Sequence, residues 1–342
     1  MASAIKTSAL VTNLGAYYQE HRDEIIGDIL LGLQPLFDSM GITVWDGVAD
    51  EIPLLNNVMG NILQPGGSPE STNFTDDILT IDNRILKVKP VKFDLKFVPQ
   101  NFERQWITYN RTKRATMKEW QDIPFHQYFV EQIVAKIKEE LFLASWTAKT
   151  ANATTTYTSI IDGWVTLLKA DVNAGVPKVS QVGSGNAIIA GNVVTELEAI
   201  ADGISDAQAA ETSFMYVSPT VAKWYVRADP SALGRGGVDF NGINHVMNGQ
   251  GFPEMWLRGA NVRICPTPGL SKSATGFANE AVIVTRKGNM IVGTDSMNEI
   301  NDMDFQKFER TIKVFGDFKW GVNYRNANTA KKPIFVNNGA GW

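Results

Sequence analysis

The side chains most often used for catalysis are few in this chain and far apart. The three histidines are His21, in an acidic segment, His126, near the start of a long helical pattern, and His245, in a loop rich in Gly and Asn. None belongs to an H-x-x-x-H or HExxH arrangement, in which two imidazoles on one helical face bind zinc. Cys265 is the only cysteine and lies in the apolar segment "ANVRICPTP", which favours a small buried side chain. The chain therefore encodes no internal disulfide and no multi-thiolate metal cluster.

The densest group of carboxylates lies in "TDSMNEINDMD", residues 294–304. Its acidic residues are Asp295, Glu299, Asp302 and Asp304. Carboxylates bind hard cations, but the ligand spacing of an EF-hand and its glycine are missing, which favours a solvated acidic turn over a cation site. Glu139 and Glu140 are consecutive on a predicted helix, so they do not face one cleft as a general acid and base would.

Two glycine-rich segments are candidates for phosphate-binding loops. "GSGNAIIAG" around Gly183 lacks both the G-x-G-x-x-G spacing and the Lys-Ser/Thr of a P-loop, and "ALGRGG" near Arg235 has no strand-to-helix context. Both are interpreted as ordinary loops. We therefore predict that the chain is not an enzyme, with no catalytic residue, bound cofactor or metal ion.

Basic and aromatic residues are interleaved in one segment. It contains Arg104, Trp106, Tyr109, Arg111, Lys113, Arg114, Lys118 and Trp120. Such a pattern could bind single-stranded nucleic acid by stacking. Acidic residues that could neutralise it lie upstream, at Asp23, Glu24, Asp28, Glu70, Asp76, Asp77 and Asp82. Charge pairing with a neighbouring copy of the same chain is the simpler explanation, and we favour it.

The composition agrees with this view. The net charge is −4, whereas a dedicated nucleic-acid binder usually shows a strongly basic domain or stripe. The 44% hydrophobic and 20% charged residues are typical of a globular core. The sequence has no run of about 18 apolar residues, and "MASAIKTSALVTNLGAYY" at the N-terminus has no basic region followed by an apolar one. We therefore expect a cytoplasmic product without a membrane span.

One long helix dominates the elements that must position these residues. In "DIPFHQYFVEQIVAKIKEELFLASWTAKT", residues 122–150, apolar residues recur every four positions, and Asp122 with Pro124 supplies a start signal. The stripe predicted to pack consists of Phe125, Phe129, Ile133, Ile137 and Leu141. At about 1.5 Å per residue the helix would extend roughly 40 Å, which exceeds the diameter of a small domain. We expect one of its faces to be buried along its whole length.

The segments before this helix have distinct patterns. Residues 13–37 carry apolar residues at helical spacing between acidic ones, and Pro35 closes the pattern, so an amphipathic arm is predicted. Residues 60–77 have no periodic apolar pattern and are interpreted as a flexible connection. Alternating residues predict two long strands, 79–98 and 103–118, that form a hairpin. An isolated two-stranded ribbon is barely stable in water, so it must lean on another part, for which another subunit is the candidate.

After the long helix, helices and strands come in runs. Helices are predicted in "SIIDGWVTLLKA" and "NVVTELEAIADGISDAQAA", the second capped by Asn192. "FMYVSPTVAKWYVRADP" predicts a strand followed by a helix, with Ser218 at the N-cap and Pro219 at the first position. Strands are then predicted in "NVRICPT", "EAVIVTRKG", "NMIVGTD" and "FQKFERTIKVFGDFKWGVNYR". This order is typical of an α+β protein.

The order of these elements resembles that of the major capsid proteins of tailed bacteriophages, the Caudovirales type, which have the Hong Kong 97 fold. "FERTIKVFGDFKWGVNYRNA" resembles the family's closing P-domain strand, which passes back into the A-domain, and "MYVSPTVAKWYVRAD" resembles its strand and helix with a buried Trp. "MWLRGANVRICPTPGL", residues 255–270, is similar to a recurrent A-domain strand through Trp256, Gly259, Val262, Pro266 and Pro268. The resemblance covers nearly the whole chain as a pattern.

The resemblance implies an α+β fold with four parts. They are an N-terminal arm (1–57), an extended E-loop hairpin (58–120), a P-domain with a long spine helix (121–214 and 291–321) and an A-domain (215–290 and 322–342). The spine helix would lie across the P-domain sheet, and the E-loop would rest on the adjacent subunit. The E-loop and the arm would bury their apolar faces between copies. The residues expected in E-loop contacts are Lys87, Lys89, Lys92, Lys96, Arg104, Trp106, Arg111, Lys113 and Arg114.

By implication, the chain is a structural protein that self-assembles into hexamers and pentamers of an icosahedral head shell. The shell would enclose the double-stranded DNA of a tailed phage and contact it diffusely. Portal and scaffolding or decoration proteins are further expected partners, and the expected location is the virion, after assembly in the host bacterial cytoplasm. An encapsulin-type nanocompartment shares the fold and is the alternative. For an unrecognised enzyme or carbohydrate-binding module, the sequence offers no triad, metal set or phosphate loop.

Some members of this family join an E-loop lysine to an asparagine on a neighbouring P-domain, with a buried glutamate as base. Lysines are available here, at Lys87, Lys89, Lys92 and Lys96. Residues 305–318 contain no asparagine, and the aligned position holds Glu309, whose carboxylate cannot lose ammonia to form an isopeptide bond. Asn298 and Asn301 lie just upstream. We expect a shell that is held together without covalent links.

Overall fold

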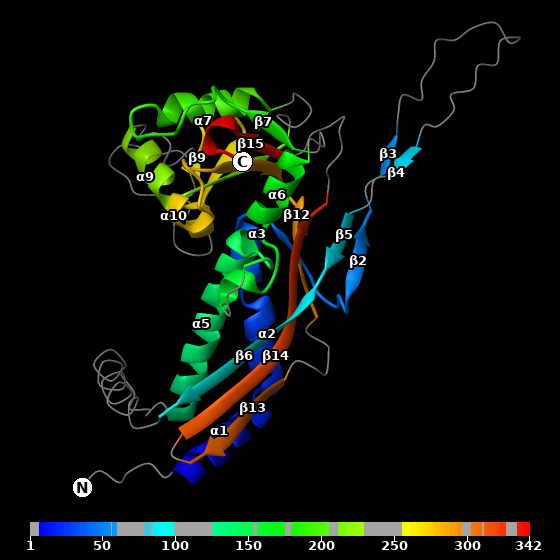
Figure 1. Cartoon of the computed structure of the whole chain (residues 1–342), viewed down its shortest axis with the longest axis vertical. Helices are drawn as coiled ribbons and strands as arrows, with labels where there is room; N and C mark the ends of the chain where they lie inside the picture. The colour runs from blue at the N-terminus through cyan, green and yellow to red at the C-terminus, as the bar shows by residue number, and fades with distance from the viewer. Residues whose placement is uncertain are drawn as a thin grey trace, which may run out of the picture.

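The computed structural model describes residues 7–55, 57–59, 79–81, 84–98, 125–152, 156–174, 179–204, 211–228, 255–295, 302–309, 311–325 and 334–342. Figure 1 shows one sheet in the upper part of the molecule, a second sheet that runs down the long axis, and a narrow ribbon of strands to one side. The fold is of the mixed α+β type that the sequence predicts.

In the part of the chain that the structure describes, the upper sheet has six strands in the order β7-β15-β11-β8-β10-β9. The strands are β7 (Ser180–Val182), β8 (Ser213–Val217), β9 (Met255–Trp256), β10 (Val262–Pro266), β11 (Val282–Arg286) and β15 (Ile334–Asn337). The central strand β8 is buried throughout, and four of its five residues are apolar, because both of its faces are covered. Met215 and Val217 pack with helices α7 (Val193–Asp202) and α9 (Pro219–Ala228), whereas Phe214 and Tyr216 belong to the main core.

The long sheet is built around β14 (Thr311–Tyr324). Its other strands are β1 (Thr43–Trp45), β6 (Lys89–Phe97), β12 (Met290–Thr294) and β13 (Asp302–Phe308). β14 pairs with β12 along its C-terminal part and with β6 and β13 along its N-terminal part. Ile312, Val314, Phe318 and Trp320 of β14 are buried, and the side chains between them are mostly more exposed. One face of this sheet therefore faces the core while the other is more open.

The segment predicted as a single C-terminal strand is a hairpin, so that prediction was wrong. β13 and β14 pair antiparallel from Asp302↔Asp317 to Phe308↔Thr311. Glu309 lies between them with a φ of 52°, a left-handed conformation that helps to reverse the chain. The turn was missed because "FERT" contains none of the Gly, Pro or Asn residues that usually mark one.

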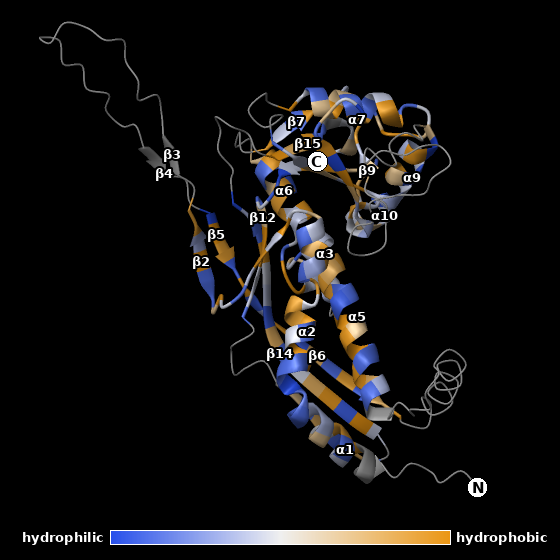
Figure 2. Ribbon diagram, turned by 180° about the vertical axis from the view of Figure 1, so that it is seen from behind, coloured by the Kyte–Doolittle hydropathy of each residue, from blue (hydrophilic) through white to orange (hydrophobic). Residues whose placement is uncertain are grey.

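The long helix predicted within residues 122–150 is confirmed as α5 (Phe125–Thr147). Figure 2 shows α5 on the same face of the long sheet as the N-terminal helices. Its outer side carries an ion pair between Lys136 and Glu139, with 2.9 Å between Nζ and Oε2. The ring of Phe129 lies 4.0 Å from that of Phe97 on β6. Of the predicted stripe, the structure buries Phe129, Ile133 and Leu141 and half-buries Ile137, and the side chain of Phe125 lies outside the described part.

The N-terminal segment forms α1 (Thr7–Glu20), α2 (Arg22–Leu31) and α3 (Gln34–Ser39). Leu14 and Tyr18 of α1, with Ile25 of α2, join the main core, and the Tyr18 hydroxyl accepts a 2.9 Å hydrogen bond from the backbone N–H of Met303. The expectation that the arm buries its apolar face between copies is therefore wrong for these residues, because the sheet of the same chain covers them. Pro35 lies in the first turn of α3, so it begins a helix rather than closing one.

The strand predicted over residues 79–98 is divided into segments with different partners. β4 (Leu79–Ile81) pairs with β3 (Asn57–Met59), β5 (Arg84–Lys87) pairs with β2 (Glu51–Leu54), and β6 pairs with β14. The single continuous strand predicted there was therefore wrong, because alternation identifies a strand without identifying its partner. The predicted pairing with 103–118 stays a prediction. Residues 60–77 and 103–118 lie outside the described part. We call β2, β3, β4 and β5 the ribbon, and the two large sheets with their helices the body.

A cluster of buried aromatic residues connects the two large sheets. It consists of Phe37, Trp146, Trp164, Tyr216 and Trp320, and we call it the joint. The ring of Trp146 lies 4.8 Å from that of Trp164 and 5.1 Å from that of Tyr216. Three polar tips have partners: Trp164 Nε1 donates to the Asn323 carbonyl (3.0 Å), Trp320 Nε1 to Ser145 Oγ (3.0 Å) and the Tyr216 hydroxyl to the Met40 carbonyl (2.7 Å). Trp146 Nε1 is buried without a hydrogen-bond partner among the described residues, so the joint is held by dense ring packing and these three hydrogen bonds.

The helix caps match the sequence only in part. Ser218 caps α9 as predicted, with its Oγ accepting from the Val221 N–H at 3.2 Å. Asn192 precedes α7 but does not cap it, because its side chain turns back to bond Ile189 and Ala187. The buried aromatic residue of α9 is Tyr225, whereas the predicted Trp224 is half-buried.

The remaining elements are α6 (Trp164–Asn173), α10 (Lys272–Thr275) and the 3-10 turns Tyr157–Ser159, Pro268–Leu270 and Asn338–Ala340.

None of the helices in the described ranges is long and apolar enough to cross a membrane.

Candidate functional surfaces

The potentially reactive side chains do not come together in the part of the chain that the structure describes. His21 is on the surface, 3.2 Å from Glu24, and Cys265 is buried in β10 beside β8. Asp304 is exposed and accepts a hydrogen bond from Gln306. Within the same ranges no group of three or more potential metal ligands forms. His245, Glu299, Arg235 and the side chains of His126 and Asp302 lie outside them.

The glycine-rich loop at Gly183 faces a buried carboxylate. Ser184 Oγ lies 2.6 and 2.7 Å from the two carboxylate oxygens of Glu196, and Asn186 Nδ2 donates to Ser184 Oγ at 2.9 Å. Glu196 is on the first turn of α7 and is buried. A phosphate placed here would be repelled by that carboxylate, so the loop is suited to holding α7 rather than binding an anion.

The ribbon has an apolar face on the body and, toward solvent, a face that carries both apolar and charged side chains. Leu54 and Leu86 are buried and pack with Ile291 of β12. On the other side, Leu55 is 56% exposed and Ile85 45% exposed. In a single described chain, exposed apolar side chains on a two-stranded ribbon favour an interaction surface.

Two paired glycines of the long sheet let the ribbon pack closely against it. Gly293 of β12 and Gly321 of β14 are partners in register. A Cβ on Gly321 would lie 2.1 Å from the Lys87 carbonyl oxygen, and a Cβ on Gly293 would lie 2.8 Å from Leu86 Cδ2. Any larger residue at Gly321 would push the ribbon backbone off the sheet, so the sequence fixes this close approach with glycine.

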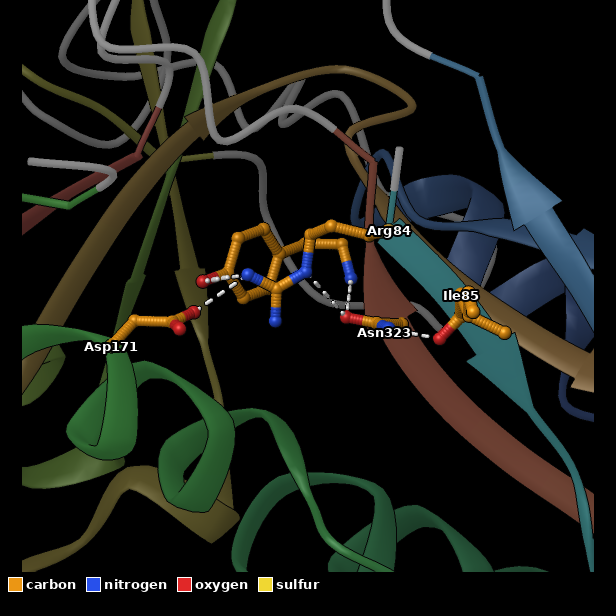
Figure 3. A network of polar contacts seen from close by, with 5 residues as sticks. Arg84, Ile85, Asp171 and Asn323 are labelled. Atoms are coloured by element: carbon orange, nitrogen blue, oxygen red, sulfur yellow. Dashed lines mark hydrogen bonds and ion pairs between the residues drawn. The ribbon is translucent and has the colours of Figure 1, made fainter. Parts of the chain in front are cut away.

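At the end of the apolar contact between the ribbon and the body, hydrogen bonds connect the two (Figure 3). Arg84, at the far end of β5, donates from Nη1 to Asp171 Oδ2 (2.7 Å) and to the Tyr324 hydroxyl (2.8 Å), and from Nε to Asn323 Oδ1 (3.2 Å). Its guanidinium carbon also lies 3.9 Å from the centre of the Tyr324 ring. Asn323 Nδ2 donates to the carbonyl of Ile85 at 2.8 Å. We call this group of residues the bracket, and it joins the ribbon to α6 and β14.

The lysines predicted to contact a neighbour have partners in their own chain. Lys87 Nζ lies 3.2 Å from Glu51, Lys89 Nζ lies 3.4 Å from Asp162, and Lys92 Nζ lies 2.9 Å from Asp94. Lys96 Nζ lies 5.3 Å from the ring centre of Phe308. The hydrogen bond to Asp94, with the charge of that carboxylate, raises the pKa of Lys92. Arg104, Trp106, Arg111, Lys113 and Arg114 lie outside the described part.

Asp162 ties the start of β6 to the segment after α5. Burial alone would raise the pKa of this carboxyl, but hydrogen bonds from the side chain and backbone of Thr150, with the charge of Lys89, outweigh burial and lower the pKa. The carboxylate is thus held charged between two segments of the body.

The open face of the long sheet carries charges of both signs. The register of β6 and β14 places Lys96 beside Lys313 and Lys92 beside Asp317. Phe308 is exposed at the end of this face, and Lys313 Nζ lies 4.0 Å from its ring centre. No pattern in the sequence identifies Phe308, Lys313, Leu55 or Ile85, because their exposure depends on strand pairing that the sequence does not show.

Comparison with known proteins gives matches among solved structures only. No protein-family model matches the sequence, and no curated protein matches it. A chain of the satellite phage P4 procapsid, in a structure that includes the size determination (Sid) protein, matches with a TM-score of 0.52 at 11% identity. This match covers 90% of the present chain and 99% of the P4 procapsid chain.

Two further solved structures are similar at lower scores. The capsid of the Myoviridae phage XM1 has a TM-score of 0.47 at 11% identity and covers 92% of each chain. The capsid of the cyanophage P-SCSP1u has a TM-score of 0.47 at 13% identity and covers 88% of this chain and 87% of its own. The P4 procapsid match covers 90% of the present chain, so the chain has the fold of a phage capsid protein.

Proposed function

We propose that this chain is the major capsid protein of a tailed phage, with a Hong Kong 97-type fold. Its copies form hexamers and pentamers of an icosahedral head shell around double-stranded DNA. The observation that carries this proposal is the fold likeness to the P4 procapsid chain over 90% of the present chain. The ribbon supports it, because Leu55 and Ile85 are exposed on a two-stranded element that a neighbouring copy would cover.

The proposed parts are the N-terminal arm (1–57), the E-loop (58–120), the P-domain (121–214 and 291–321) and the A-domain (215–290 and 322–342). The strand pairs suggest a refinement of the second part. β2 begins at Glu51 and pairs with β5, which ends at Lys87, whereas β6 pairs with β14 of the long sheet. We therefore assign residues 51–87 to the projecting loop and β6 to the P-domain.

The proposed partners are further copies of the chain, packaged DNA, and portal and scaffolding or decoration proteins, in a virion assembled in the host bacterial cytoplasm. The mixed charges of the open sheet face and the net charge of −4 support diffuse contact with DNA rather than tight binding. Lys87, Lys89, Lys92 and Lys96 remain proposed contact residues, each able to exchange its present partner for one on a neighbour.

Negative-stain microscopy of the purified protein tests the proposal. We expect closed angular shells from the natural chain. In a variant, a two-residue Asn-Gly turn replaces residues 60–78 and connects β3 directly to β4, so every described contact is kept. This variant should stay folded by circular dichroism but sediment as a subunit or small oligomer.

A matched control keeps the length of 60–78 but replaces the sequence with Gly and Ser, which separates the need for a long loop from the need for its side chains. A natural chain that stays a monomer under all assembly conditions would refute the proposed function. Normal shells from the shortened variant would refute the role of the loop.

We also propose that the shell is held without covalent links. Glu309 lies in the exposed turn between β13 and β14, and residues 305–318 contain no asparagine. Boiling purified shells in detergent should give one band near 37.7 kDa on a denaturing gel. A ladder of oligomers would contradict this.

A further inference from the structure

The contacts that hold the ribbon change in kind along its length. Near the body, Leu54 and Leu86 are packed against Ile291, and the Val88 N–H donates to the Asp50 carbonyl at 2.9 Å. The β2–β5 pairing ends at Leu54↔Arg84, and the next described pair along the chain belongs to β3–β4. Figure 1 shows β3 and β4 standing away from the body. The bracket of Figure 3 therefore lies at the point where the ribbon departs.

Arg84 makes contacts on the body in three directions. Its Nη1 reaches Asp171 on α6 and Tyr324 on β14, and its Nε reaches Asn323. The same guanidinium stacks on the Tyr324 ring. A planar fork of fixed donors suits this geometry, whereas the single ammonium of a lysine could satisfy only part of it.

Asn323 forms hydrogen bonds both to the side chain of Arg84 and to the ribbon backbone at Ile85. Its Oδ1 accepts from Arg84 Nε and from the Tyr324 N–H, and its Nδ2 donates to the Ile85 carbonyl at 2.8 Å. Its own carbonyl accepts from Trp164 Nε1 of the joint. The bracket is thereby connected to the best packed part of the body, so the direction of β5 at Arg84 follows the position of β14 and α6.

The bracket is partly shielded from water. The side chains of Arg84 and Asp171 are 14% and 20% exposed. The ion pair between Lys87 and Glu51, on the same ribbon, has side chains that are 64% and 51% exposed, and both belong to the ribbon itself. An exposed pair of this kind contributes little, whereas hydrogen bonds to a shielded charge contribute more.

From this geometry we propose that Arg84 is a positioning residue for assembly, which fixes the direction in which the ribbon leaves the body through Asp171, Asn323 and Tyr324. The ribbon then reaches a second copy of the chain already oriented. Without the bracket, the point of departure moves back toward Asp50 and Val88. This inference rests on the proposed function, but its first test does not require shells.

The first test is hydrogen exchange of the full-length subunit, in peptides that cover residues 50–55 and 84–88. The variants are Arg84→Met, which keeps the apolar stem, Asp171→Asn, which leaves the ribbon sequence unchanged, and Arg84→Lys. Glu51→Gln is the matched control, because it removes an exposed charge of the ribbon that has no part in the bracket. We expect exchange on the order of tenfold faster in Arg84→Met and Asp171→Asn. Arg84→Lys should be intermediate and Glu51→Gln should be unchanged.

Asp171→Asn guards against misfolding, because it alters neither the ribbon nor the β-sheet register. Unchanged exchange in both Arg84→Met and Asp171→Asn would overturn the inference, as would an equal effect in Glu51→Gln.

The second test is assembly of the same variants. Subunits with a loosened ribbon should give fewer closed shells than the natural chain at equal concentration. Natural shell yield from a variant whose ribbon exchanges faster would overturn the positioning role. A natural chain that forms no shells would instead refute the proposed function and leave the exchange result standing, so the two failures are distinguishable.

Discussion

The body holds its two sheets together by one kind of chemistry and holds the ribbon by another. At the joint, Trp146, Trp164 and Tyr216 pack ring against ring in a space without exposure to water. At the bracket, Arg84 and Asp171 meet through hydrogen bonds that water can reach in part. Displacement of any one ring in such packing strongly destabilises the folded protein, because the neighbouring side chains cannot fill the space that it leaves. Hydrogen bonds to a partly shielded charge contribute less than such aromatic packing, so the bracket fixes the direction of the ribbon but should be the weaker of the two connections.

Trp164→Ala should break the joint side of this comparison and give the largest effect. The side chain is fully buried and donates to the Asn323 carbonyl, so its removal leaves a large cavity and an unpaired acceptor. We expect a loss of about 3–5 kcal/mol in the free energy of unfolding, measured by denaturant titration. Trp224→Ala, at a half-buried position on α9, should cost much less. Equal losses in the two variants would mean that the joint is not specially packed.

A double-mutant cycle on the bracket gives the next largest effect. We expect Arg84→Met and Asp171→Asn to show a coupling free energy of about 1–3 kcal/mol, because each removes one partner of a partly shielded charged hydrogen bond. The same cycle on Glu51 and Lys87 should give about 0–1 kcal/mol. The measurement is denaturant unfolding of the four proteins in each cycle. If the two couplings are the same, the bracket is only another surface ion pair.

Tyr216→Phe tests the polar tip of the joint. The loss of the 2.7 Å bond to the Met40 carbonyl should cost about 1 kcal/mol at neutral pH. Burial, and secondarily the nearby Cys265, raises the pKa of Tyr216 well above its usual value. The folded chain therefore keeps the tyrosine proton at a pH where the unfolded chain has lost it. Stability from this group is full below about pH 10 and falls at higher pH, and the Phe variant should lack that fall. If the free energy of unfolding of the natural chain and of the Phe variant fell equally at alkaline pH, the prediction would be wrong.

Asp162→Asn should give the smallest effect, confined to acid. The lowered pKa of Asp162 means that the unfolded chain takes up a proton before the folded chain does as the pH falls. Its contribution is therefore present above about pH 4 and is lost below it. Thermal unfolding of the natural chain and the Asn variant should differ slightly at neutral pH and converge in acid. If the difference in unfolding temperature grew in acid, the pKa of Asp162 would not be lowered in the folded chain.

Periodicity in the sequence predicted the elements that are regular and buried. The four-residue repeat of α5 and the apolar run of β8 each depend on a single segment, so each was visible without a partner. The partners were not visible. β6 pairs with β14, far along the chain, and β2, the partner of β5, has only four residues, which is too short for alternation to identify it. The turn at Glu309 escaped because its left-handed residue is not glycine.

The bracket was beyond sequence reasoning for a different reason. Arg84, Asp171 and Asn323 come from three distant segments, and none belongs to a motif of fixed spacing. Only the seating of β5 on β12 and β14, which Gly293 and Gly321 permit, brings them together. A pattern of charges predicts that a partner exists, but the packing of the sheet decides which residue it is.

Strands that are translated early pair with strands that are translated late, so the sheets can form only late in biosynthesis. β1 pairs in parallel with β12, β6 pairs with β14, and β7 pairs in parallel with β15. Each of these strands leaves the ribosome long before its partner has been translated, and contacts between distant segments form slowly. Helices such as α5 can form while the chain is still attached, but neither sheet can close until translation reaches β14 and β15. A nascent chain therefore has no finished surface to offer a neighbour before β15 has been translated.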